Sequence, residues 1–167
     1  MDVKKLSGVE LFWESQYEQK SLYQRSSGLR LIDEASQKVI AKIPRQTFAT
    51  LALVFGINSF AISESGGPLS CYGSKDGALL WKIQPATGVH FLALSYHASM
   101  DRYLGVTWPY IKGGNKKLKV IHPFNGNVER ELDLNCPAET EFALNGNVLI
   151  TSERVMVDTN TLKVSHF

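Results

Sequence analysis

Apolar and polar residues alternate along most of the chain, and the alternating segments come in pairs of hairpin length. The same pattern occurs in segment 29–43 (LRLIDEASQKVIAKI) and in segment 69–83 (LSCYGSKDGALLWKI). Each has an alternating segment, then a polar turn, then a second alternating segment. Segment 118–132 (LKVIHPFNGNVEREL) is a third copy, and segment 155–167 (VMVDTNTLKVSHF) is a shorter fourth. Because alternation with period two puts apolar side chains on one face of an extended strand, each copy predicts a β-hairpin.

The turns of these copies strengthen the prediction. Asp76-Gly77 and Asn125-Gly126 stand at the centres of the second and third copies. Both residue types tolerate positive φ, which tight hairpin turns require. The recurring apolar positions of the repeat predict a core of Leu31, Ile40, Cys71, Leu80, Trp81, Val120, Ile121, Phe142 and Leu149.

A further pair of alternating segments precedes each hairpin. The pairs are 9–15 with 21–26, 48–55 with 58–65, 89–96 with 101–108, and 139–144 with 147–152. Four strands per unit divide the chain into units at about 8–44, 45–84, 85–133 and 134–167. The sequence therefore predicts one all-β domain over residues 1–167, long enough to bury roughly two-thirds of its unfolded surface.

This repeat resembles the blades of β-propellers of the quinoprotein-like and YVTN-like kind. The residues that carry the resemblance are Gly77–Lys82 (GALLWK), Val120–Gly126 (VIHPFNG) and Val157–Thr161 (VDTNT). The resemblance implies about four tandem four-stranded antiparallel units in a small propeller-like fold, and it carries no functional residue. A β-sandwich or an open β array is the alternative architecture.

Composition narrows the class of protein. Hydrophobic residues make up 44% and charged residues 20% of the chain, which is typical of a folded globular domain. The net charge of +2 is lower than expected for a dedicated nucleic-acid binder. Cys71 and Cys136 are predicted to be free buried thiols. We find no apolar run of signal-peptide or membrane-spanning length, so we expect a cytoplasmic protein.

The candidate catalytic and metal residues are sparse. His90, His97, His122 and His166 lack the spacing that directs two imidazoles at one metal, so neither metal nor cofactor is predicted. A cluster of His97, Asp101 and Arg102, with Ser95 or Ser99 as nucleophile, would be the site of a hydrolytic or small-molecule-binding propeller. The same residue types are common in any β-turn, so the favoured interpretation is that the protein is not an enzyme.

One connection is longer than the repeat requires. The segment 108–117 (WPYIKGGNKK) contributes nearly all of the nine extra residues in the spacing of the third hairpin. Loops that exceed the needs of a scaffold often carry function. Aromatic and cationic side chains together suit a protein interface, or single-stranded nucleic acid along 108–119. A plain hairpin tip, whose aromatic residues fold back on their own unit, is the structural alternative.

Strand connectivity predicts what lies beside this connection. In a four-stranded meander the second connection lies at the same end as the links between units, here near 85–88 and 135–139. The predicted docking residues are Trp108, Tyr110, Lys112, Lys116, Lys117 and Glu139. We therefore expect a non-catalytic protein-binding module, in its narrower form an inhibitor or immunity protein that neutralises a toxin. An enzyme or small-molecule binder and a single-stranded nucleic-acid binder are the alternatives.

Overall fold

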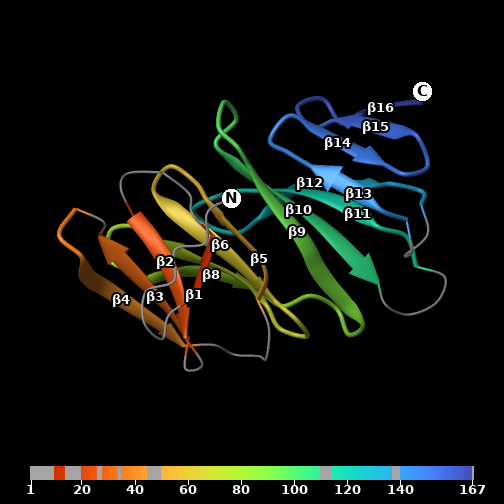
Figure 1. Ribbon diagram of the computed structural model, residues 1–167. Coiled ribbons are helices and arrows are strands. Elements are labelled where there is room, and N and C mark those ends of the chain that lie inside the picture. The colour runs from red at the N-terminus through yellow and green to blue at the C-terminus, as the bar shows by residue number, and fades with distance from the viewer. Residues whose placement is uncertain are drawn as a thin grey trace.

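The computed structural model describes residues 10–13, 20–25, 28–33, 35–44, 50–109, 114–136 and 140–166 (Figure 1). Every regular element in these ranges is a β-strand. The strands form four antiparallel sheets of four strands each, and each sheet is a meander in which neighbouring strands follow one another along the chain. The predicted fold class is therefore confirmed.

The bounds of the strands match the predicted alternating segments. The first sheet holds β1 (Glu10–Trp13), β2 (Lys20–Arg25), β3 (Gly28–Asp33) and β4 (Lys38–Pro44). The second sheet holds β5 (Thr50–Phe55), β6 (Ser59–Glu64), β7 (Leu69–Gly73) and β8 (Leu79–Ile83). The third sheet holds β9 (Val89–His97), β10 (Arg102–Pro109), β11 (Lys117–Ile121) and β12 (Val128–Asp133). The fourth sheet holds β13 (Phe142–Leu144), β14 (Val148–Thr151), β15 (Val155–Asp158) and β16 (Lys163–His166).

The outer hairpins of the four sheets are structurally equivalent. In the first three hairpins the register shifts at the same place, between Leu31 and Ile32, between Cys71 and Tyr72, and between Val120 and Ile121. All four turns contain a residue with positive φ at the equivalent position, namely Gln37, Gly77, Gly126 and Leu162. The repeat in the sequence is therefore a repeat in structure, and the first three hairpins also share the bulge, which the fourth hairpin lacks.

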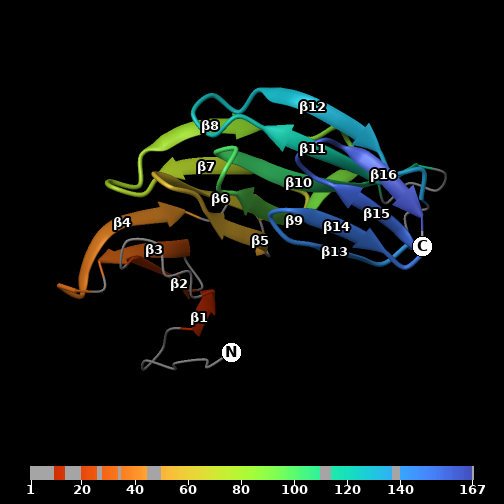
Figure 2. The ribbon, with the colours of Figure 1, turned by 90° about the horizontal axis from the view of Figure 1, so that it is seen from above.

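The sheets stand side by side in an open arc (Figure 2). The first strands of the last three sheets face the inner side of this arc, where β9 contacts both β5 and β13. The first and fourth sheets lie at opposite ends, so the four sheets do not close into a ring. We call the face of a sheet that points toward the next sheet along the chain its forward face, and the opposite face its rear face.

Three hydrophobic layers hold the sheets together, one between each successive pair. Leu31 and Phe60 belong to the layer between the first and second sheets. Trp81 and Tyr103 belong to the layer between the second and third, and Val120 and Leu149 to the layer between the third and fourth. Neighbouring sheets bury the faces that point toward each other, as alternation with period two allows.

Most of the predicted core is buried, with one error. Leu31, Cys71, Trp81, Val120, Ile121 and Leu149 are buried, while Ile40 and Phe142 are half-buried. Leu80 is exposed, because it is the extra residue of the bulge and has no partner on β7. Cys71 and Cys136 are free and buried, as predicted. The described part of the chain has no helix with the length and hydropathy that crossing a membrane requires.

Candidate functional site

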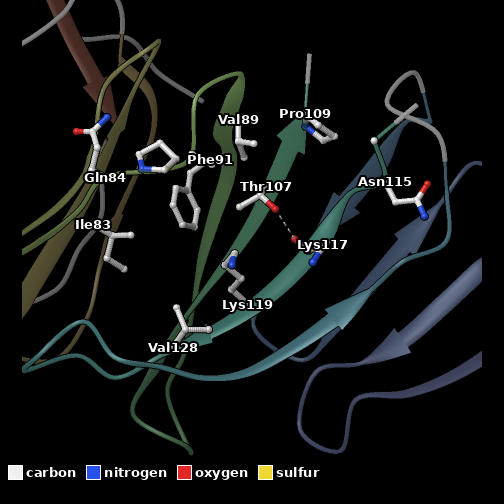
Figure 3. A pocket seen from close by; sticks show the side chains of 13 residues that line it. Ile83, Gln84, Val89, Phe91, Thr107, Pro109, Asn115, Lys117, Lys119 and Val128 are labelled. Carbon is white, nitrogen blue, oxygen red and sulfur yellow. Dashed lines mark hydrogen bonds between the residues drawn. The ribbon is translucent and has the colours of Figure 1, made fainter. Parts of the chain in front are cut away.

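An apolar pocket opens between the second and third sheets, next to the long connection that follows β10 (Figure 3). Its volume is about 410 Å³, within the range of roughly 300–1,000 Å³ that ligand pockets occupy. We call it the apolar pocket. Its lining residues are Ile83, Gln84, Pro85, Ala86, Val89, Phe91, Thr107, Pro109, Gly114, Asn115, Lys117, Lys119 and Val128.

The wall of this pocket depends on a glycine inside a strand. Gly105 lies on the rear face of β10, between Tyr103 and Thr107, and a Cβ there would lie 2.8 Å from Cδ1 of Phe91. Because Gly105 has no side chain, the Phe91 ring can approach β10 this closely. The Thr107 hydroxyl donates to the carbonyl oxygen of Lys117 at 3.3 Å, which ties β10 to the start of β11 beside the pocket.

The charges at the edge of the apolar pocket are neutralised by pairing. Lys117 Nζ lies 2.7 Å from Oε1 of Glu131, and Lys119 pairs with the other oxygen of the same carboxylate. Hydrogen bonding to Glu131 raises the pKa of Lys117, and the two lysines hold the pKa of Glu131 below its usual value. One carboxylate shared between two ammonium groups leaves the edge of the pocket with only a small positive charge.

A second, more open hollow lies on the other side of the third sheet, between it and the fourth. We call it the Trp108 hollow. Its volume is about 680 Å³, and its lining residues are Leu92, Ala93, Trp108, Lys116, Thr140, Glu141, Phe142 and Leu144. The Trp108 ring is half-buried, with its centroid 6.2 Å from that of His90. The described ends of the long connection therefore line both hollows, Pro109, Gly114 and Asn115 the apolar pocket and Trp108 and Lys116 the Trp108 hollow.

Lys116 is a structural residue rather than an exposed contact. It is buried, its ammonium donates to the carbonyl oxygen of Thr140 at 2.7 Å, and it stands 5.8 Å from the centroid of the Phe142 ring. Its backbone amide also donates to the carbonyl oxygen of Cys136 at 3.3 Å. The buried ammonium of Lys116 thus has a hydrogen-bond acceptor and an aromatic ring beside it. These contacts join the third sheet to the segment that leads into the fourth.

The predicted docking residues thus divide into three groups. Trp108 and Lys116 line the Trp108 hollow, and Lys117 lines the apolar pocket on the opposite face of the third sheet. Tyr110, Lys112 and Glu139 lie outside the described residues. The described residues of the two links do lie beside the described ends of the long connection, as the alternation of connections in a meander requires. Residues 84–86 line one hollow with Gly114 and Asn115, and residues 140 and 141 line the other with Trp108 and Lys116.

Sequence reasoning missed the apolar pocket itself. In the sequence, the apolar lining residues look like ordinary strand residues; these are Ile83, Val89, Phe91 and Val128. The local sequence does not distinguish a residue that lines a pocket from one that belongs to a core layer. One available signal was Gly105, a glycine in the middle of an alternating strand, which often marks a close approach of another group.

The candidate triad does not assemble around His97. The Tyr96 hydroxyl donates to Oδ1 of Asp101 at 2.5 Å, and Arg102 pairs with Glu129 at 2.6 Å. The buried His97 instead has its Nδ1 3.3 Å from the Ser99 hydroxyl. The acid that would orient His97 as a general base is thus engaged by Tyr96. The described residues contain no group of three or more metal-ligating side chains in a suitable arrangement.

Comparison with known proteins places this architecture in the β-propeller class. No protein-family model and no curated protein matches the chain. The chain is similar to the solved Pan2 WD40 domain of Neurospora crassa, with a TM-score of 0.65 at 8% identity, covering 99% of this chain and 54% of that one. It is also similar to the Cps50 (Swd1) β-propeller domain of Myceliophteria thermophila, with a TM-score of 0.66 at 10% identity over 98% of this chain and 55% of that one.

BamB from Moraxella catarrhalis gives a comparable match, with a TM-score of 0.61 at 12% identity over 87% of this chain and 45% of that one. The chain thus spans about half the length of the propeller chains that it matches. These likenesses establish the fold: four sheets of the propeller kind, in an open arc. The predicted resemblance to propeller blades is confirmed at this level.

Proposed function

We propose that this chain is a non-catalytic protein-binding module whose partner docks on the end of the arc that carries the long connection. The apolar pocket is the observation that carries the proposal. A partner that inserts an aliphatic or aromatic side chain there would desolvate Phe91, Val89 and Val128 together, and interfaces concentrate their energy in such anchored side chains. The Trp108 hollow offers a second contact across the same end.

The charges near the pocket favour a protein over a nucleic acid. Phosphate binding requires cations that can exchange their counterions for phosphate. Of the lysines described near the connection, Lys116 is buried against Thr140, and Lys117 and Lys119 share Glu131. We expect partner binding to weaken only slightly as the salt concentration rises, in contrast to a single-stranded nucleic-acid binder.

The test compares two exposed apolar residues, Val128 and Leu79, at equivalent positions of two sheets. Val128 lines the apolar pocket, whereas Leu79 occupies the same place on β8 and does not line it. Wild type, Val128→Glu and Leu79→Glu are immobilised, and the proteins retained from a lysate of the native cell are quantified by mass spectrometry. We expect a partner that wild type and Leu79→Glu retain and Val128→Glu loses. Equal retention by all three would contradict the proposal.

The narrower form of the proposal is that binding neutralises the partner, as an inhibitor or immunity protein does. Once a partner is identified, its activity is measured while the chain is added to saturation. Stoichiometric loss of activity supports neutralisation, whereas an unchanged activity in the complex leaves a binding module and excludes the inhibitor form.

A small ligand is the second candidate, because the volume of the apolar pocket lies in the range for such ligands. A lysate of the native cell is dialysed, and the melting temperature of the purified protein is measured in the dialysable fraction and in the retained fraction. This comparison separates a small ligand from a protein partner. Stabilisation of wild type by the dialysable fraction, absent in Val128→Glu, supports a small molecule, and stabilisation confined to the retained fraction supports a protein.

A further inference from the structure

Equivalent rows of residues run across the forward faces of the last three sheets. The paired registers define these rows as Val54–Ala61–Cys71–Trp81, Ser95–Leu104–Val120–Arg130 and Ala143–Ile150–Met156–Ser165. In the second and third sheets the two central residues of the row form the layer against the next sheet. Among the described parts of the chain, no sheet lies in front of the same row in the fourth sheet.

Exposure at these positions changes sharply at the fourth sheet. Leu104 and Val120 are 0% exposed, whereas Ile150 is 41% and Met156 is 38% exposed. Ile150 and Met156 are directly paired across β14 and β15, so they form one apolar surface with Ala143 beside them. The fourth sheet therefore presents, at the end of the arc, the kind of face that each preceding sheet buries.

Another exposed residue of the same sheet provides a contrast. Val164 is 45% exposed, but its equivalents Val39, Leu79 and Val128 are exposed in every sheet. Exposure of Val164 is therefore a regular property of the outer strand beside its turn. Exposure of Ile150 and Met156 is specific to the last sheet, and this difference indicates an unfilled position rather than a general feature of the repeat.

Hydrogen bonds from the outer strand of one sheet to the hairpin turn of the next form a series that also ends at the fourth sheet. Trp81 Nε1 donates to the carbonyl oxygen of Pro123 at 2.7 Å, and Arg130, at the equivalent place in the third sheet, donates to the carbonyl oxygen of Asn160 at 2.7 Å. Each bond fastens the outer strand of one sheet to the hairpin turn of the next. The next residue of this series is Ser165, whose hydroxyl donates to the carbonyl oxygen of Met156 in its own sheet, at 3.5 Å.

The opposite end of the arc offers the complementary face. Leu31 faces forward into the layer with the second sheet, so Ile32 lies on the rear face of the first sheet, paired with Val39. The rear face of each later sheet, with Tyr72, Ile121 and Val157 at the position of Ile32, is the surface that the preceding sheet covers. A second copy of the chain therefore offers, at Ile32, the position that the preceding sheet covers in each later sheet.

We propose that the forward face of the fourth sheet binds the rear face of the first sheet of a second copy of this chain, and that two copies joined in this way at both ends form a closed ring of eight sheets. The contact continues the sheet-on-sheet layers that already join the four sheets. This sequence spans 54% and 55% of two matched propeller chains, so two copies of it supply about the length of such a propeller. Eight sheets lie at the upper end of the four to eight blades that propellers typically contain.

The first experiment is sedimentation of the 167-residue protein over a range of concentrations. Wild type is expected at twice the 18.6 kDa of one chain, Met156→Glu as a monomer, and Val164→Glu as a dimer like wild type. Circular dichroism checks that both variants keep their strand signal, which their exposed positions favour. A monomeric wild type, or a Val164→Glu variant that dissociates as Met156→Glu does, would overturn the proposal. Open assemblies of growing mass would contradict a closed ring.

The second experiment does not rely on a variant that could misfold. A photo-crosslinking amino acid replaces Met156, and the protein is mixed with an isotopically labelled copy of the wild type. Crosslinks from position 156 to labelled residues 28–44 support the head-to-tail contact. Crosslinks to labelled residues 142–166 would show that two fourth sheets face each other, and would refute it.

Discussion

The indole nitrogen of Trp81 donates a hydrogen bond to the carbonyl oxygen of Pro123 at 2.7 Å, and this bond joins the second sheet to the hairpin of the third. The thiol of Cys71 points at the same carbonyl, with Sγ at 3.9 Å. The Trp81 ring also packs edge-on against Tyr103, with their centroids 6.2 Å apart. One side chain thus contributes both apolar area and a directional bond between two sheets, through residues 42 positions apart in the sequence.

Trp81→Ala should lower the free energy of unfolding by about 3–5 kcal/mol, because it removes a large buried ring and leaves a cavity between the sheets. Urea denaturation followed by circular dichroism measures the change. Trp81→Phe is the control that keeps an aromatic ring but not the donor, and it should cost less than Trp81→Ala. A loss of under about 1 kcal/mol for Trp81→Ala would contradict the prediction, because it would mean that this ring contributes little to the contact between the sheets.

Gly126→Ala should be more destabilising than Gly66→Ala. Both glycines have positive φ, 72° and 68°, so both substitutions incur a backbone strain of about 1–2 kcal/mol. A Cβ at Gly126 would lie 2.8 Å from Cδ2 of Trp81, whereas a Cβ at Gly66 would meet nothing within 4 Å. Thermal melting of the two variants separates the strain from the clash. Equal melting temperatures would mean that the Trp81 ring yields without cost.

Stability should fall as the pH rises from about 9 to about 11. Burial raises the pKa of the Cys71 thiol from 9.0 to about 11, so over this interval the unfolded chain loses a proton that the folded chain keeps. The contribution is fully present below pH 9 and disappears as the pH approaches 11, with a slope of up to about 1.4 kcal/mol per pH unit. Burial also raises the pKa of the Tyr103 hydroxyl, which extends the loss to higher pH.

Urea denaturation at several pH values measures this dependence, and Cys71→Ala is the matched variant. It should be less stable than wild type at neutral pH, because a buried side chain is shortened, but its stability should decline less steeply between pH 9 and 11. Parallel curves for the two proteins would show that the thiol does not titrate differently in the folded and unfolded states.

Two neighbouring lysines should respond differently to truncation. Lys116→Ala removes a buried ammonium that bonds the Thr140 carbonyl, and we expect a loss of roughly 2 kcal/mol. Lys117→Ala removes one exposed partner of Glu131, which retains Lys119, and we expect a much smaller loss of stability than for Lys116→Ala. Chemical denaturation of both variants decides the matter, and equal losses would contradict a structural role specific to Lys116.

The predicted docking surface shows where sequence reasoning was limited. Trp108, Lys116 and Lys117 are close in sequence and carry the chemistry of an interface, yet Lys116 is buried, Lys117 is paired and Trp108 is half-buried. A pattern of residue types identifies the connection as unusual. It does not say which side chains turn inward, because that depends on Thr140 and Phe142, which enter from the next sheet.

The sequence by itself determined the strands, the turns and their grouping into four meanders. Period-two alternation and positive-φ turn residues such as Gly77 and Gly126 act over a few neighbouring positions, so they can be read without knowing the rest of the fold. The tertiary structure alone decided that the arc stays open, that a pocket forms beside Gly105, and that Ile150 and Met156 remain exposed. These features arise where separate sheets meet, and the gain from such contacts depends on partners more than forty residues apart, as between Trp81 and Pro123.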